Sequence, residues 1–124
     1  MARSELDSRL VLVVDDELEA VLHLIAILEK KGYEVMAAHD GKQALEQFRI
    51  RPAAAVITDL QMPEMNGAEL IGHLREDAPD LPVVIVSGKV EIDIDNLSTP
   101  DAETYLIKKP VDLRELLAKL DQLI

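Results

Sequence analysis

The chain has 124 residues, of which 48% are hydrophobic, so it fits a single globular domain and not a disordered segment. Its net charge of −11 disfavours nucleic acid and anionic membrane surfaces as direct partners, because both bind clustered Lys and Arg. The lack of cysteine excludes disulfides and thiolate metal sites. No signal-peptide pattern and no apolar run of membrane-spanning length is present, so we expect a soluble cytoplasmic protein.

The first predicted elements are a strand and a helix. Residues 1–9 form a polar leader that we expect to be loose. The continuous apolar run Leu10–Val14 predicts a strand that is covered on both faces. Apolar residues then recur at spacings of three and four, which is typical of an amphipathic helix; they are Leu18, Val21, Leu22, Ile25 and Leu28. Two lysines and Gly32 predict the end of this helix.

A second strand and helix follow. Glu34–Ala38 predicts a short strand. Asp40 is expected to cap a helix, with Gln43 three residues on, and the inward side chains of that helix are Leu45 and Phe48. Pro52 ends the helix, and residues 54–58 form the third predicted strand.

The remaining elements repeat the same alternation. Asn66 with Glu69 predicts the start of a helix, and Asp112 with Glu115 predicts the start of the last one. Residues 82–86 and 105–108 read as the fourth and fifth strands. The expected buried stripes are Leu70, Ile71 and Leu74 in the first of these helices, and Leu113, Leu116, Leu117 and Leu120 in the last.

This alternation predicts an α/β fold over residues 10–124. The fold is a doubly wound, five-stranded parallel sheet with helices on both faces and right-handed crossovers. Only residues 91–103 depart from the pattern, because apolar residues are sparse there and Pro100 would break a helix. We therefore expect an atypical fourth helix: a short, irregular or mobile segment. Ligands in such folds bind at the carboxyl ends of the strands.

Polar residues follow four of the five predicted strands. Asp15 and Asp16 follow the first, Asp59 the third, Ser87 the fourth and Lys109 the fifth. Clustered carboxylates repel one another, and Mg²⁺ removes that cost because it takes oxygen ligands and retains several waters. An aspartate can attack a phosphoryl group and form an acyl phosphate. A lysine and a hydroxyl would then supply the positioning and charge that phosphoryl transfer needs.

Each of these residues also has an ordinary structural interpretation. Asp15 and Asp16 could be a helix cap with a solvated neighbour, and Asp59 and Ser87 could be turn residues. Their joint occurrence at four strand ends favours a functional site over these separate interpretations. The three histidines do not cluster at a spacing typical of metal ligands.

These residues resemble the receiver domain of two-component response regulators, which has a flavodoxin-like fold. The resemblance covers residues 10–124 and rests on four motifs in combination: Asp15-Asp16, the Asp-x-x-Met-Pro-x-Met-x-Gly segment at 59–67, Ser87-Gly88 and Lys109-Pro110. It implies a signalling switch in a two-component phosphorelay. Its partners would be a histidine kinase or phosphotransfer protein and a downstream protein target.

The resemblance also assigns roles. It implies that Asp59 receives a phosphoryl group from a kinase phosphohistidine. Mg²⁺ would be bound by Asp59, directly by Asp16, largely through water by Asp15, and by the backbone carbonyl of Gln61. The domain would catalyse only its own phosphorylation and dephosphorylation, and is otherwise not an enzyme.

The resemblance further implies that Ser87 is the switch hydroxyl and that Lys109, followed by a cis bond to Pro110, binds the phosphoryl group. The family usually has an aromatic residue three positions before this lysine, where the chain has Leu106; Tyr105 lies one position earlier. Counting from Tyr105 would favour Lys108 instead, whereas the Lys-Pro pair favours Lys109.

Two positions are expected to affect how long the phosphoryl group lasts. In the family, the residues two after the phosphoacceptor and two after the switch hydroxyl flank the hydrolytic water, and these are Gln61 and Lys89 here. Lys89 could instead point into solvent.

Three alternative functions are open to the sequence. The chain could be a receiver fragment of a hybrid histidine kinase or of a DNA-binding response regulator. It could also be a degenerate receiver used only for binding, although its complete acidic set disfavours this. A haloacid-dehalogenase phosphatase requires a second acid two residues after the nucleophile, and Gln61 stands there.

Overall fold

The computed structural model describes residues 9–62, 64–88 and 103–124. A five-stranded sheet runs through its centre in the order β2-β1-β3-β4-β5, and every neighbouring pair is parallel. The strands are β1 (Leu10–Val14), β2 (Glu34–Ala38), β3 (Ala55–Asp59), β4 (Val83–Ser87) and β5 (Thr104–Lys108). The predicted five-stranded parallel sheet is confirmed.

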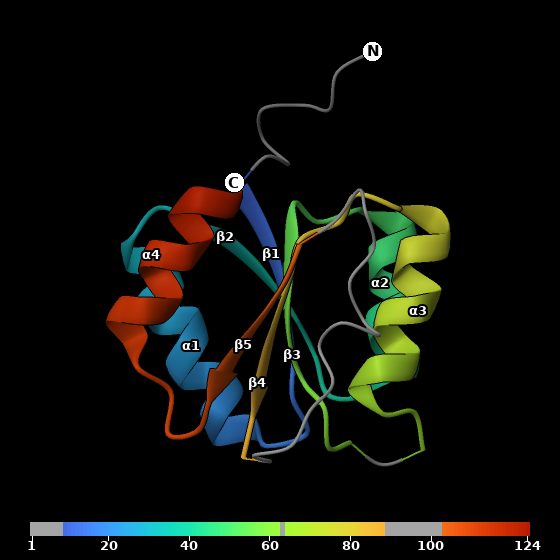
Figure 1. Cartoon of the computed structure of the whole chain (residues 1–124), viewed down its shortest axis with the longest axis horizontal. Helices are drawn as coiled ribbons and strands as arrows, with labels where there is room; N and C mark the ends of the chain where they lie inside the picture. Colours follow the sequence, from blue (N-terminus) through green and yellow to red (C-terminus); the bar gives the residue numbers. More distant parts are fainter. Residues whose placement is uncertain (1–8, 63, 89–102) are drawn as a thin grey trace.

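Helices cover both faces of the sheet (Figure 1). Helices α1 (Leu18–Lys30) and α4 (Leu113–Leu123) lie on one face, and α2 (Gly41–Ile50) and α3 (Gly67–Asp77) lie on the other. The core accordingly forms two apolar clusters, one under each helical layer, and alternate residues of each central strand belong to different clusters. This is the doubly wound arrangement that the sequence predicts.

Two strands extend one residue further than predicted, which matters for the site. Strand β3 ends at Asp59 and β4 ends at Ser87, and both residues are buried. Asp59 is paired in register with Val86, and Ser87 with Lys108. The polar residues are therefore the last members of the strands and are held by the sheet itself.

The three predicted N-cap residues, Asp40, Asn66 and Asp112, cap their helices, and the cap at Asn66 is a complete capping box. The Asn66 side chain accepts a hydrogen bond from the Glu69 backbone N–H at 2.9 Å, and the Glu69 carboxylate accepts one from the Asn66 backbone N–H at 3.4 Å. The Asp40 and Asp112 side chains cap α2 and α4. In α2 the Gln43 carboxamide accepts from the His39 N–H instead of from that of Asp40.

Helix α1 is confirmed, but not all of the apolar residues that define its helical period are buried. Leu18 and Leu22 are 69% and 56% exposed, while Leu24 is buried together with Val21 and Leu28. The apolar residues of this helix therefore extend beyond its buried face.

Parts of the prediction lie outside the described residues. Residues 1–8 of the leader, Lys89 and nearly all of 91–103 are among them. Arg9, the last leader residue, donates from Nε to the Gly32 carbonyl at 3.1 Å and lies over the Tyr33 ring. It is therefore fixed to the fold.

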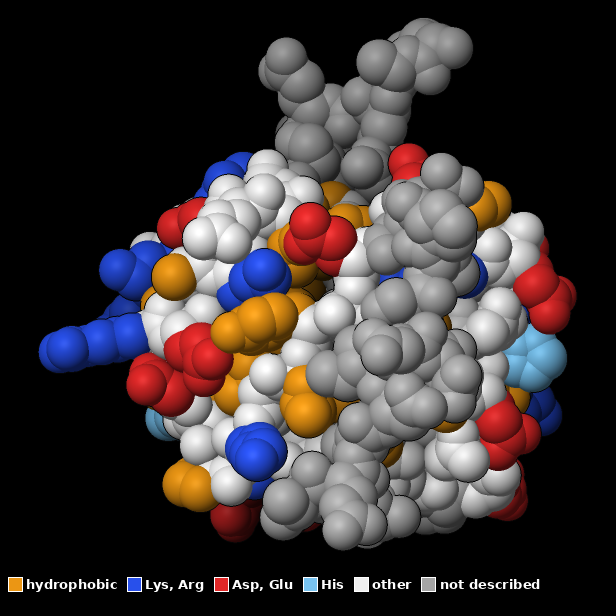
Figure 2. Space-filling view, viewed as in Figure 1, with side chains coloured by type: hydrophobic (Ala, Val, Ile, Leu, Met, Phe, Trp, Pro, Cys, Tyr) orange, Lys and Arg blue, Asp and Glu red, His pale blue; other side chains and the backbone are white. Residues whose placement is uncertain are grey.

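The described surface carries both signs of charge. Among the coloured side chains of Figure 2, those of Lys and Arg are spread over the visible face between acidic and uncharged groups. No helix within the described ranges is both long enough and apolar enough to cross a membrane.

Candidate functional site at the carboxyl edge of the sheet

Asp59 lies at the centre of the candidate site. Its side chain is only 6% exposed, and its two carboxylate oxygens have different partners. Oδ1 accepts a hydrogen bond from the Gln61 backbone N–H at 3.0 Å, and Oδ2 lies 2.8 Å from Lys109 Nζ. A backbone N–H thus fixes one oxygen, while the Lys109 ammonium contacts the other.

The loop after Asp59 is folded tightly against the strand end. The Gly67 N–H donates to the Leu60 carbonyl at 3.0 Å. A Cβ atom at Gly67 would lie 2.5 Å from the Asp59 carbonyl oxygen and 2.8 Å from Leu60 Cα, which no side chain tolerates. The glycine of the 59–67 motif therefore lets α3 begin directly beside the candidate phosphoacceptor.

Lys109 reaches the site from the loop after β5. Its backbone N–H donates to the Ser87 carbonyl at 2.9 Å, and its peptide bond to Pro110 is cis. Its ammonium also lies 3.9 Å from Asp15 Oδ2. Burial lowers the pKa of Lys109, but its hydrogen bond to Asp59 and the surrounding carboxylate charges outweigh burial and raise it. The ammonium therefore stays charged at neutral pH.

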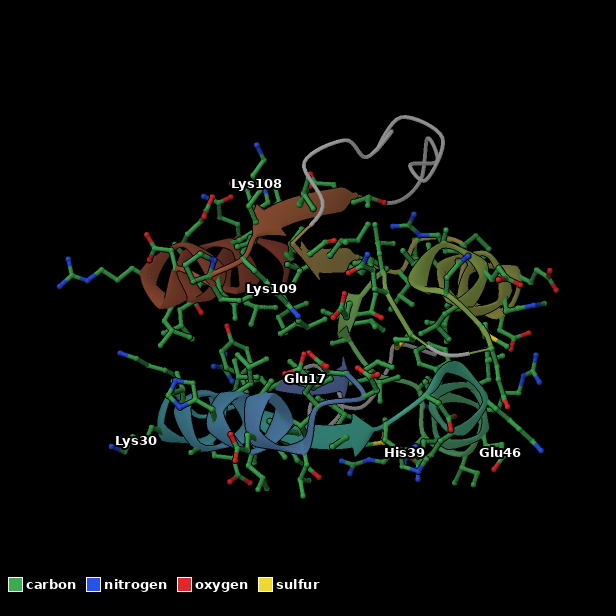
Figure 3. All side chains as sticks on the ribbon, turned by 90° about the horizontal axis from the view of Figure 1, so that it is seen from below. Glu17, Lys30, His39, Glu46, Lys108 and Lys109 are labelled. Carbon is green, nitrogen blue, oxygen red and sulfur yellow. The ribbon has the colours of Figure 1, made fainter. Side chains whose placement is uncertain are left out.

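The neighbouring Lys108 differs in orientation. It is exposed, and Figure 3 shows its side chain pointing away from the space into which Lys109 points. The structure thus brings Lys109 to Asp59 and leaves Lys108 at the surface. This is the geometry that the Lys109 assignment requires.

Three consecutive acids follow β1. The carboxylate oxygens of Asp15, Asp16 and Glu17 lie within 4.8 Å of one another, and this is the one such group among the described residues. Asp15 is buried, and its Oδ1 accepts from the Glu17 N–H at 2.9 Å. Burial raises the pKa of Asp15, although the Glu17 N–H and Lys109 counteract it. Asp59 does not belong to this group, although the sequence placed it with Asp15 and Asp16.

Glu17 is a residue that the sequence interpretation missed. It is the N-cap residue of α1 but makes no side-chain capping bond, and it lines the same cavity as Asp59 and Lys109. The available signal was its position directly after the acidic pair. A Glu there is also a common first-turn residue, and the pattern does not distinguish the two roles.

A cavity of about 340 Å³ opens beside Asp59. Helix α1, the ends of β1 and β3, and the loop from Lys109 to α4 form its walls. Its charged lining residues are Asp15, Glu17, Asp59 and Lys109, and most of the others are aliphatic. The lining of this cavity thus combines three carboxylates and one lysine with mostly aliphatic side chains.

Ser87, Tyr105 and Leu106 do not line this cavity. Ser87 is fully buried at the end of β4 and does not line the cavity. Tyr105 faces α4, where its hydroxyl donates to Glu115 Oε2 at 2.8 Å, and Lys119 Nζ lies 4.4 Å from its ring. Leu106 points to the opposite face and packs on the α2–α3 core.

The comparisons with known proteins agree with this architecture. Residues 11–121 match the family model of the response regulator receiver domain, and the chain belongs to this family. It is a receiver domain of the two-component response regulators.

Relatives of different lengths share this domain. The chain is 29% identical to the response regulator receiver protein CpdR of Brucella abortus, over 92% of this chain and 95% of that protein. It is 39% identical to the transcriptional regulatory protein ZraR of Escherichia coli O157:H7, over 90% of this chain but only 25% of that protein. The chain therefore spans about a quarter of that longer relative.

A solved structure shows the same fold. The response regulator protein TrrA of Thermotoga maritima, in complex with Mg²⁺–BeF, superposes with a TM-score of 0.83 at 30% identity. The match covers 94% of this chain and 99% of that one.

Proposed function

We propose that this receiver domain accepts a phosphoryl group on Asp59 and thereby changes the surface that it presents to other proteins. The observation that carries this proposal is the pair of contacts around Asp59, namely the Gln61 N–H on one oxygen and Lys109 on the other. An oriented carboxylate beside a charged lysine is what in-line attack on phosphorus requires.

The transfer step follows from these positions. A carboxylate oxygen of Asp59 forms the new O–P bond, while the bond between phosphorus and the donor atom breaks and its electron pair leaves with the donor. Lys109 exchanges its contact with Oδ2 for a phosphoryl oxygen and neutralises part of its charge. Ser87, at the end of the adjacent strand, is the proposed switch hydroxyl, and Gln61 is proposed to flank the hydrolytic water.

The acidic residues fit a hard divalent cation. Asp15, Asp16 and Asp59, with the Gln61 carbonyl, are the proposed ligands of Mg²⁺, and Glu17 extends the same acidic group. All of these are oxygen donors, and burial raises the pKa of Asp15, so a cation beside this carboxylate would offset part of the cost of burying its charge. When bound, Mg²⁺ supplies positive charge that reduces the repulsion between carboxylates and phosphoryl oxygens.

The wider role follows from the family. We propose that the protein acts in the cytoplasm, with a histidine kinase or phosphotransfer protein as the phosphodonor and a downstream protein as the target. Phosphorylation and loss of phosphate are proposed as the only reactions that the domain catalyses. In the alternative, the chain is the receiver part of a longer regulator or hybrid kinase, which is consistent with its match to a quarter of ZraR.

Intact-mass measurement tests the proposal. Incubation with acetyl phosphate and Mg²⁺ should add one phosphoryl group to the wild-type chain and none to Asp59→Asn. Asp80→Asn makes the same chemical change on an exposed residue far from the site and should be modified like the wild type. Equal modification of Asp59→Asn and the wild type would refute the assignment.

A further inference from the structure

The acidic run after β1 divides between two sides of the site. Asp16 lines a hollow of about 240 Å³ on the β2 side, which His39 and Gln43 also line. Glu17 lines the larger cavity on the α4 side, together with Lys109 and Asp59. Asp15 lines both. The two exposed acids therefore have different surroundings, and Glu17 alone of the two shares a cavity with the lysine.

Glu17 and Lys109 face one another across the mouth of this cavity. Figure 3 shows the two side chains extending from opposite walls toward the same space. The charge of Glu17 also contributes to raising the pKa of Lys109. Carboxylates outnumber lysines three to one among the charged residues that line the cavity, and Glu17 is the exposed carboxylate of the three.

We propose that Glu17 biases the phosphodonor preference of this site against donors of high negative charge. This inference rests on the proposed phosphorylation of Asp59. The exposed carboxylate partly cancels the positive field of Lys109 at the entrance, so a dianionic acyl phosphate is repelled more than a phosphoramidate of lower charge. Glu17 thus lowers the rate with the dianionic donor more than the rate with the donor of lower charge.

The two reactions differ only in the bond that breaks. In each, an Asp59 oxygen forms an O–P bond. With phosphoramidate the N–P bond breaks and the nitrogen leaves as ammonia, carrying its proton. With acetyl phosphate the acyl O–P bond breaks and acetate leaves. The Glu17 charge acts on the donor before either bond changes, so it affects the two donors in proportion to their charge.

The size of the effect follows from Coulomb's law. A unit charge several ångströms from the phosphoryl group, in a medium close to water, alters the rate by roughly threefold for each unit of donor charge. Glu17→Gln should thus raise the ratio of acetyl phosphate rate to phosphoramidate rate by roughly threefold. Glu17→Lys changes the charge twice as much and should raise the ratio about tenfold.

The experiment measures the initial rates of phosphorylation with each donor by intact mass, at saturating Mg²⁺ and low ionic strength. The ratio of the two rates cancels any effect on Mg²⁺ that is common to both donors. Glu19→Gln removes the same charge from the same helical turn, at an exposed residue that does not line the cavity, and should leave the ratio at its wild-type value. Added salt should reduce the Glu17 effect.

The outcomes separate this inference from the proposed function. If Glu17→Gln and Glu17→Lys keep the wild-type ratio, or if Glu19→Gln shifts it equally, Glu17 does not affect the choice of donor. The proposal that Asp59 is phosphorylated would still stand after that result. If neither donor modifies the wild type, or if Asp59→Asn is still modified, the proposed function itself fails. A rate ratio that rises in Glu17→Gln and rises further in Glu17→Lys supports the inference.

Discussion

At the scale of single residues, Asp59 is the last residue of a buried strand and also the start of a tight loop. Its Oδ1 is held by the Gln61 N–H, so the side chain needs no further ordering before it reacts. The loop that supplies this N–H depends on Gly67, where even a methyl group would meet the Asp59 backbone. The orientation of the carboxylate therefore depends on a residue that never contacts a substrate.

Gly67→Ala should destabilise the fold and slow phosphorylation of Asp59, because backbone atoms at 2.5 and 2.8 Å must shift to admit the methyl group. Gly72→Ala, within the same helix, meets nothing within 4 Å and should stabilise by about 0.5–1 kcal/mol. Thermal melting and phosphorylation rates of the two variants provide the comparison. Equal melting temperatures would contradict the close packing at Gly67.

Tyr33 should make stability depend on alkaline pH. Its side chain is 4% exposed, and burial, followed by the hydrogen bond to Asp121, raises its pKa from 10.0 to about 12. The folded state then keeps a proton that the unfolded chain has lost, so this contribution to stability is present below about pH 10 and disappears as pH rises toward 12.

Tyr33→Phe, which has no hydroxyl, is the test of this dependence. At neutral pH it should be about 1 kcal/mol less stable, for the lost hydrogen bond. Urea unfolding at increasing alkaline pH should show the gap between the two proteins narrowing as pH rises through the window. A gap that stays constant or widens would show that the phenol does not keep its proton in the folded state.

At the scale of elements, strands and helices follow from local patterns, and their ends depend on contacts that sequence patterns do not contain. A run of Val, Ile and Ala predicts β3, but nothing in it shows that Asp59 is the last paired residue. Glu115 matches the capping-box signature, yet its carboxylate binds the Tyr105 hydroxyl from a different element. Leu18 and Leu22 fit the helical period of α1 and are nevertheless exposed.

Arg75 joins three elements that are distant in sequence. From α3, its buried guanidinium donates to the Leu81 carbonyl before β4 at 3.0 Å and to the Glu103 carbonyl at 2.9 Å. It also donates to the Thr104 hydroxyl of β5 at 2.7 Å. The starts of two neighbouring strands are thus fixed to one side chain.

Arg75→Lys should cost about 1–3 kcal/mol, because a single ammonium cannot serve these acceptors in their fork geometry. Arg49→Lys is the matched control, since its pair with Asp77 is exposed and should contribute little. Urea unfolding measures both free energies. The role assigned to Arg75 would be wrong if the two substitutions cost the same.

At the scale of the whole molecule, parallel topology brings together residues that are far apart in the chain. Asp15, Asp59 and Lys109 follow or end three different strands, and the carboxylates of the two aspartates both lie within 4 Å of the Lys109 ammonium. The sequence predicts this meeting, because all strands end at one edge. It does not predict the cavity beside them or the direction of Glu17, since both depend on how α1 and α4 pack.

The chain carries a net charge of −11, so we expect cations to affect the stability of the fold. Mg²⁺ should raise the melting temperature, because a ligand that binds only the folded state stabilises it. Asp16→Ala should remove most of this shift, whereas Asp80→Ala, at an exposed turn, should keep it. If Asp16→Ala retains the full shift, the cation binds elsewhere or acts only by screening charge.

The central claim is that Asp59 carries the phosphoryl group, and chemical trapping tests it most directly. Borohydride reduces an acyl phosphate to the corresponding alcohol, so a phosphorylated aspartate becomes homoserine. Peptide mass spectrometry after acetyl phosphate, Mg²⁺ and borohydride should find homoserine at position 59 and at no other aspartate. Homoserine at Asp15 or Asp16, or an acid-stable phosphate on Ser87 with Asp59 unchanged, would contradict the account.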